Sequence, residues 1–120
     1  MNSHSRQITA LMFALALGAC ATPSGPKPHD WALEVQTAET REAHNRLADH
    51  YDEVASTMDA DAAEEKAMLG QYIASPHKYG KQIQEIKARS LSMIHDFELA
   101  AAESRKMAAY HRQLAGSLGR

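Results

Sequence analysis

Apolar residues recur every seven positions on both sides of a short segment that contains Pro76 and Gly80. The repeating lines before this segment are Leu47, Val54 and Met68; His44, Tyr51, Met58 and Tyr72; and Ala48, Ala55, Ala62 and Leu69. The lines after it are Ile86, Met93, Ala100, Met107 and Leu114; Ile83, Ser90, Phe97, Ser104 and His111; and Ile94, Ala101 and Ala108. A sustained seven-residue repeat is typical of a helix that packs against another helix along its length.

The repeat predicts two long helices, over about residues 31–74 and 81–114. No segment alternates with a period of two, so the expected fold class is all-α, a long antiparallel, coiled-coil-like helical hairpin. A break near 57–61 is the alternative, because Asp61 and Glu64 resemble a capping box that would start a new helix and give three helices. The heptad phase passes through 57–61 without a shift, which favours one continuous helix.

The turn between the two helices lies between Ser75 and Gly80. Ser75 precedes a proline and is therefore disfavoured in helical geometry, while Gly80 permits a positive φ. Ser75 could instead cap the second helix, with Pro76 in its first turn. These two interpretations place the start of the second helix five residues apart.

A turn centred near His77 sets the register of the hairpin. Leu47 then faces Met107, His44 faces His111, and Glu65 faces Arg89 or Ser90. We expect Glu65 and Arg89 to form a structural ion pair that fixes this register.

Charge is divided between the two helical segments. Residues 30–66 contain eleven acids and three bases, whereas residues 78–120 contain eight bases and four acids. Segments of opposite sign attract each other when they lie side by side, although two independently solvated faces are the simpler alternative.

Two helices alone form one seam and little interior. The apolar stripe covers three heptad positions rather than two, which favours a second partner surface. We therefore expect a homo-oligomer, most simply two hairpins in a four-helix bundle, or a complex with another helical protein. A monomeric hairpin with an alanine-rich exposed flank is the alternative.

The start of the chain has the pattern of an export signal. A short basic head ends at Arg6, and about ten mostly apolar residues follow, from Ile8 to Leu17. This run is too short to span a bilayer, which needs about twenty residues. Small residues then precede Cys20, the only cysteine of the chain.

The sequence Leu17-Gly18-Ala19-Cys20 closely resembles the lipobox of bacterial lipoproteins. The resemblance implies a signal peptide over residues 1–19, cleavage between Ala19 and Cys20, and attachment of lipid, including palmitate, to Cys20. Two or three acyl chains hold a protein firmly on a membrane without spanning it. A lipidated Cys20 also leaves no thiol for an intramolecular disulfide.

Ala21 follows the cysteine. In the enterobacterial sorting rule for lipoproteins an aspartate there means retention at the inner membrane, so the resemblance implies a cell-envelope protein anchored to the outer membrane and facing the periplasm. Residues 20–29, with three prolines and a glycine, are expected to form the lipidated cysteine and a proline-rich tether. Residues 30–116 are expected to form the hairpin domain, and 117–120 a flexible tail.

His44, Met107 and His111 are the candidate ligands of a metal ion. Met107 and His111 are four residues apart and share one helix face, which His44 meets in the predicted register. Imidazole and thioether together suit Cu(I), or Zn(II) with fewer sulfur ligands. The chain contains seven histidines, so a pair at the end of a bundle also arises from packing alone, and both roles stay open.

Several other functions lack their sequence patterns. The inward Glu-x-x-His pairs of a carboxylate di-metal bundle are missing, as are a glycine-rich phosphate loop and an activated nucleophile, so we expect no enzyme activity. A formal net charge of -2 argues against nucleic acid as a partner. The expected function is a non-catalytic structural or protein-interaction module on a lipid anchor. The alternative is a small periplasm-facing lipoprotein that binds Cu or Zn in metal handling or stress protection.

Overall fold

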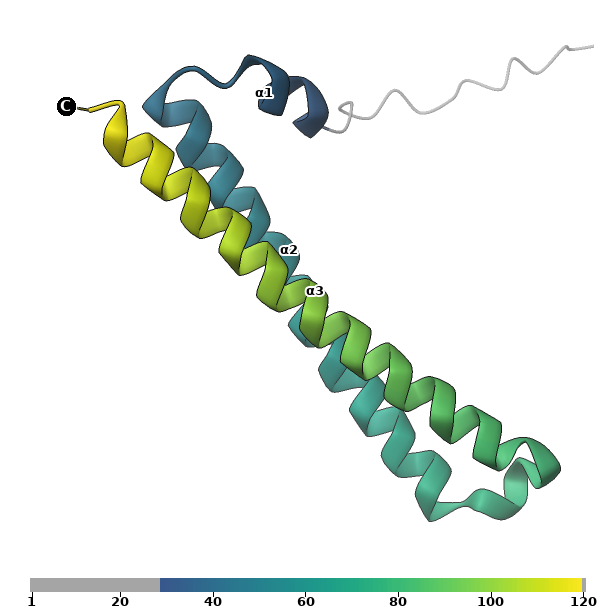
Figure 1. Cartoon of the computed structure of the whole chain (residues 1–120). Coiled ribbons are helices and arrows are strands. Elements are labelled where there is room, and N and C mark those ends of the chain that lie inside the picture. The colour runs from purple at the N-terminus through teal and green to yellow at the C-terminus, as the bar shows by residue number, and fades with distance from the viewer. Residues whose placement is uncertain (1–28, 120) are drawn as a thin grey trace, which may run out of the picture.

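The computed structural model describes residues 29–119, which form three α-helices and two short 3-10 helices (Figure 1). No strand occurs within that range. The predicted signal peptide, the Ala19–Cys20 cleavage site and almost all of the tether lie outside the described residues. The helices are α1 (Trp31–Thr37), α2 (Arg41–Ala74) and α3 (Ile83–Ser117), and the 3-10 helices are Pro76–Lys78 and Gly80–Gln82.

Helices α2 and α3 lie side by side and antiparallel as an extended hairpin, which confirms the predicted all-α fold class (Figure 1). Helix α2 passes through residues 57–61 without interruption, so the alternative with a break there is wrong. Helix α3 ends at Ser117, one residue beyond the expected domain boundary.

The first helix does not extend from residue 31 to residue 74 as the sequence predicts, because the chain breaks at residues 38–40. Ala38 and Thr40 both adopt extended backbone geometry. The hydroxyl of Thr40 accepts a hydrogen bond from the backbone N–H of Ala43 at 3.1 Å, which caps the start of α2. The heptad lines begin only at His44, so no repeated contact with α3 holds residues 31–40 in one straight helix.

The turn resolves the two interpretations of Ser75. Ser75 ends α2, since its N–H donates to the carbonyl of Gln71 at 3.1 Å and its side chain caps no helix. Pro76 then starts the first 3-10 helix, and Gly80 has a φ of 53°, a left-handed conformation that favours glycine. Helix α3 consequently starts late, at Ile83.

Alanine residues occupy the centre of the seam between α2 and α3. The buried small residues at seven-residue spacing are Ala48, Ala55 and Ala62 in α2 and Ala101, Ala108 and Ala115 in α3. The sequence places the alanine lines beside the contact, whereas the structure places them within it. Because the distance between packed helices depends on the side chains at the contact, alanine lets the two backbones approach closely. Larger side chains such as Met93 and Met107 are displaced to the edge of the seam.

Ion pairs between the helices line one edge of the seam. They join Lys66 to Glu98, Asp59 to Arg105 and Asp52 to Arg112, at intervals of seven residues on both helices. Two of the three join an acid of α2 to a base of α3, in line with the divided charge of the sequence. Exposed pairs of this kind add little stability individually, but their common spacing favours one register.

The alanine seam predicts a strong dependence of stability on side-chain size. Replacing the buried Ala101 by leucine forces the helices apart and should lower the free energy of unfolding by about 1–3 kcal/mol. The same replacement at the neighbouring exposed Ala102 should change it by less than about 0.5 kcal/mol. Urea denaturation followed by circular dichroism measures both, and equal losses at the two positions would contradict the seam.

Candidate functional site

Two histidines meet at the end of the hairpin opposite the turn. The Nδ1 atoms of His44 in α2 and His111 in α3 are 3.1 Å apart, so one ring donates a hydrogen bond and the other accepts it. The ring of Tyr51 stacks on His111 at 11° between planes, with centroids 5.7 Å apart. The pair therefore joins the two long helices at the open end of the seam.

The surroundings of His111 disfavour its protonated form. Burial lowers the pKa of His111 below the ordinary value of 6.5, and the charge that His44 carries when protonated lowers it further. Two imidazoles in hydrogen-bond contact need an unprotonated nitrogen as the acceptor, so the contact itself requires at least one neutral ring.

Helix α1 packs on α2 at this same end. The ring of Trp31 stacks on His50 of α2, with centroids 3.9 Å apart and 16° between planes. Asp30 caps α1 by accepting a hydrogen bond from the N–H of Leu33 at 3.0 Å. The ring of His29 also contacts the indole, with centroids 4.1 Å apart and the planes tilted by 50°.

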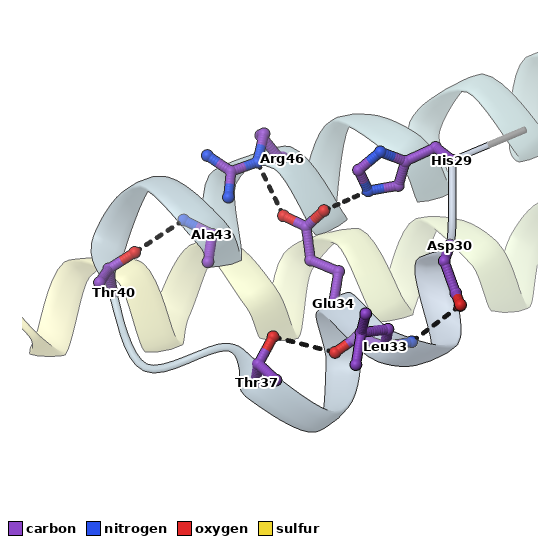
Figure 2. Close-up of a pocket in the computed structure, with 8 residues that line it drawn as sticks. All are labelled: His29, Asp30, Leu33, Glu34, Thr37, Thr40, Ala43 and Arg46. Carbon is purple, nitrogen blue, oxygen red and sulfur yellow. Dashed lines mark hydrogen bonds and ion pairs between the residues drawn. The ribbon is translucent and has the colours of Figure 1, made fainter. Parts of the chain in front are cut away.

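A pocket of about 380 Å³ separates α1 from the start of α2 (Figure 2). Glu34 projects from α1 into it and is only 9% exposed. Arg46 of α2 donates a hydrogen bond to its carboxylate at 2.7 Å, and His29 donates a second. The remaining residues that line the pocket are Asp30, Leu33, Thr37, Thr40 and Ala43.

Glu34 is held in its charged form despite being buried. Burial alone would raise the pKa of its carboxyl, but the hydrogen bonds and positive charges of His29 and Arg46 outweigh it and leave the pKa below the ordinary value. Both oxygens are engaged by these two partners. Glu34 therefore has the role of fastening α1 to α2 and is not a free acid or base.

The structure brings together only part of the predicted metal site. His44 and His111 meet, whereas Met107, one turn before His111, is 38% exposed at the edge of the seam. Within residues 29–119 no group of three or more histidine, cysteine, aspartate or glutamate side chains is arranged to hold a metal ion. Two nitrogens supply half of a tetrahedral site, so Met107 and water would have to complete it.

The predicted Glu65–Arg89 ion pair is not formed. The hydroxyl of Ser90 instead donates a hydrogen bond to the carboxylate of Glu65 at 2.5 Å, and both residues are buried. Arg89 is exposed and pairs within its own helix with Glu85 at 2.7 Å. Ser90, rather than Arg89, therefore lies within the seam opposite Glu65, and its hydroxyl satisfies the buried carboxylate.

Sequence reasoning missed the contacts of α1. The rings of His29 and His50 both lie against Trp31, a contact that the heptad repeat does not indicate. The available signals were the only tryptophan of the chain and Thr40, a favoured capping residue at the point where the heptad repeat stops.

A scan against protein-family models, a search of curated proteins and a search of solved structures each found no match. None of the helices in residues 29–119 has both the length and the apolar character needed to cross a membrane.

The histidine contact predicts a loss of stability in acid. Above about pH 6.5 His111 is neutral in both the folded and the unfolded chain, so its titration does not change the free energy of unfolding there. Below that pH the unfolded chain binds a proton first, and the free energy of unfolding falls until the pH passes the lowered pKa of the folded state. Urea denaturation between about pH 8 and pH 5 measures this loss.

His111→Gln should reduce this loss of stability at low pH. His95→Gln, which changes an exposed histidine of the same helix, should leave the loss of stability unchanged. If the His111 variant lost as much stability at low pH as the unchanged protein, the histidine contact would not be the cause of that loss.

Proposed function

We propose that this protein is a lipid-anchored component of a bacterial cell envelope whose helical hairpin acts by binding and not by catalysis. The observation that carries the proposal is the sequence Leu17-Gly18-Ala19-Cys20 after an apolar run of about ten residues, with Cys20 the only cysteine. Ala21 supports the outer membrane, facing the periplasm, as the destination. Anchoring would leave the helical domain free to contact other proteins.

The shape of the hairpin supports an interaction role. Helix α1 lies at the end of the hairpin where α2 begins and α3 finishes (Figure 1). In the proposed arrangement the anchor would be connected to the end of the hairpin that carries the histidine pair. At 1.5 Å per residue, α2 alone would project the turn about 50 Å from that end. Several large apolar side chains, including Met93 and Leu114, are exposed along this length.

Metabolic labelling with palmitate tests the anchor. The protein should incorporate label and fractionate with membranes, and Cys20→Ser should abolish both because the only lipid-accepting thiol is lost. Ser24→Ala, a change in the same tether, is the matched control and should leave labelling intact. An unlabelled wild-type protein, or equal labelling after Cys20→Ser, would contradict the proposal.

A second candidate function is metal binding, favoured by the convergence of the His44 and His111 nitrogens. Small movements of the rings would let both coordinate one Zn(II) or Cu(I) ion, with Met107 as a thioether ligand in the copper case. Such a protein would serve metal handling or stress protection.

Isothermal titration of the Cys20→Ser chain with Zn(II) and Cu(I) tests this second candidate, since the substitution removes the competing thiol. Metal binding predicts heat that disappears in the His44→Ala, His111→Ala double variant and persists in His77→Ala, a change in the turn. No heat above the buffer, or heat that the double variant retains, would remove the candidate.

A further inference from the structure

A line of apolar residues runs along α3 at one edge of the seam. The line consists of Ile86, Met93, Ala100, Met107 and Leu114, which follow one another at intervals of seven. Met93, Met107 and Leu114 are 44%, 38% and 46% exposed, although side chains of this kind are usually buried. We refer to these five residues as the methionine line.

The methionine line lies away from the ion pairs that join the two helices. Glu98, Arg105 and Arg112 each follow a member of the line by five residues, which places them about 140° further round the helix. These charged residues are already neutralised within the hairpin. Within residues 29–119 no ion pair between the helices flanks the methionine line, so the line offers an apolar surface to a partner.

A groove with both apolar and acidic walls joins the methionine line to α2. Met68 of α2 is 39% exposed and borders the same groove as Met93, and this groove has a volume of about 260 Å³. The groove is lined by Asp61, Glu64, Glu65, Met68, Met93 and Phe97. Both helices therefore contribute to one face, as in a hairpin that forms half of a four-helix bundle.

The order of side chains in the methionine line is symmetric about Ala100. Counted outward from Ala100, the line has a methionine and then a branched aliphatic residue in each direction. An antiparallel copy of α3 would place Ala100 against Ala100, Met93 against Met107 and Ile86 against Leu114. Two-fold interfaces require this kind of self-complementary surface. The small central residue also lets the two helices approach closely.

The flanking polar residues fit the same pairing. Arg89 and Tyr110 are exposed and lie at nearly equal distances on either side of Ala100, so each would meet the other across the two-fold axis. A guanidinium and an aromatic ring attract through a cation–π interaction. Asp96 and Glu103 would approach each other near the axis as like charges, and Lys106, which donates to Glu103 at 2.6 Å, supplies the opposite charge that reduces their repulsion.

We propose that the partner of the methionine line is a second copy of this chain, bound antiparallel about a two-fold axis at Ala100. The proposal rests on the interaction role proposed for the hairpin and names its partner. It does not need the lipid, so the test uses the full chain with Cys20→Ser, and its failure would leave the palmitate result unaffected.

Single cysteines added to that chain test the register. Ala100→Cys should give a disulfide-linked dimer on mild oxidation, because the two residues meet at the axis. Leu91→Cys is the control. Leu91 is 58% exposed and lies on the opposite side of α3 from Ala100, so the Leu91→Cys chain should stay monomeric. When Met93→Cys and Met107→Cys chains are mixed, they should form more disulfide-linked dimer than either variant forms by itself. Efficient linkage of Met93→Cys to itself would overturn the antiparallel arrangement.

Sedimentation equilibrium of the Cys20→Ser chain without added cysteines tests the association directly. The chain should be a dimer, and Met107→Glu should weaken the dimer by roughly tenfold or more because two charges enter an apolar contact. Leu91→Glu should leave association unchanged. Circular dichroism should show equal helix content in all three proteins. A chain that stays monomeric at all concentrations, or equal weakening by both variants, would overturn the proposal.

Discussion

The close contact between α2 and α3 along lines of alanine is the constraint on which the rest of the structure depends. Small residues such as Ala55 and Ala101 bring the two backbones together and leave little space between them. Glu65 and Ser90 fit into the same narrow seam because the serine hydroxyl satisfies the buried carboxylate. Met93 and Met107 lie at the edge of this seam, where they form part of the exposed apolar face of α3.

The two edges of the seam consequently differ in chemistry. One is closed by ion pairs at seven-residue intervals, and the other exposes the methionine line. At the end opposite the turn, the His44–His111 contact closes the seam and α1 covers part of α2 through Trp31 and the buried Glu34. A hairpin of this construction has one satisfied edge and one edge with apolar surface left for a partner.

The heptad repeat was sufficient to predict the all-α hairpin, the continuity of α2 and the meeting of His44 with His111. It could not select which of three adjacent lines faces the partner helix, because a rotation of the helix by a few tens of degrees exchanges them. That choice depends on packing between the helices. In the packed hairpin the rotation of α3 does not place Arg89 against Glu65. The break before Arg41 depends on one capping residue, Thr40, and on the packing of Trp31, which no repeat encodes.

A distance between spin labels at Asn45 and Gln113 tests the central contact most directly. Both positions are exposed near the open end, and the labelled chain would carry Cys20→Ser and be diluted with unlabelled chain, so that only distances within one molecule are seen. A hairpin with helix axes about 10 Å apart predicts a short separation, lengthened only by the label arms. If α2 and α3 instead formed one extended rod, the labels would lie roughly 100 Å apart, and the account would be wrong.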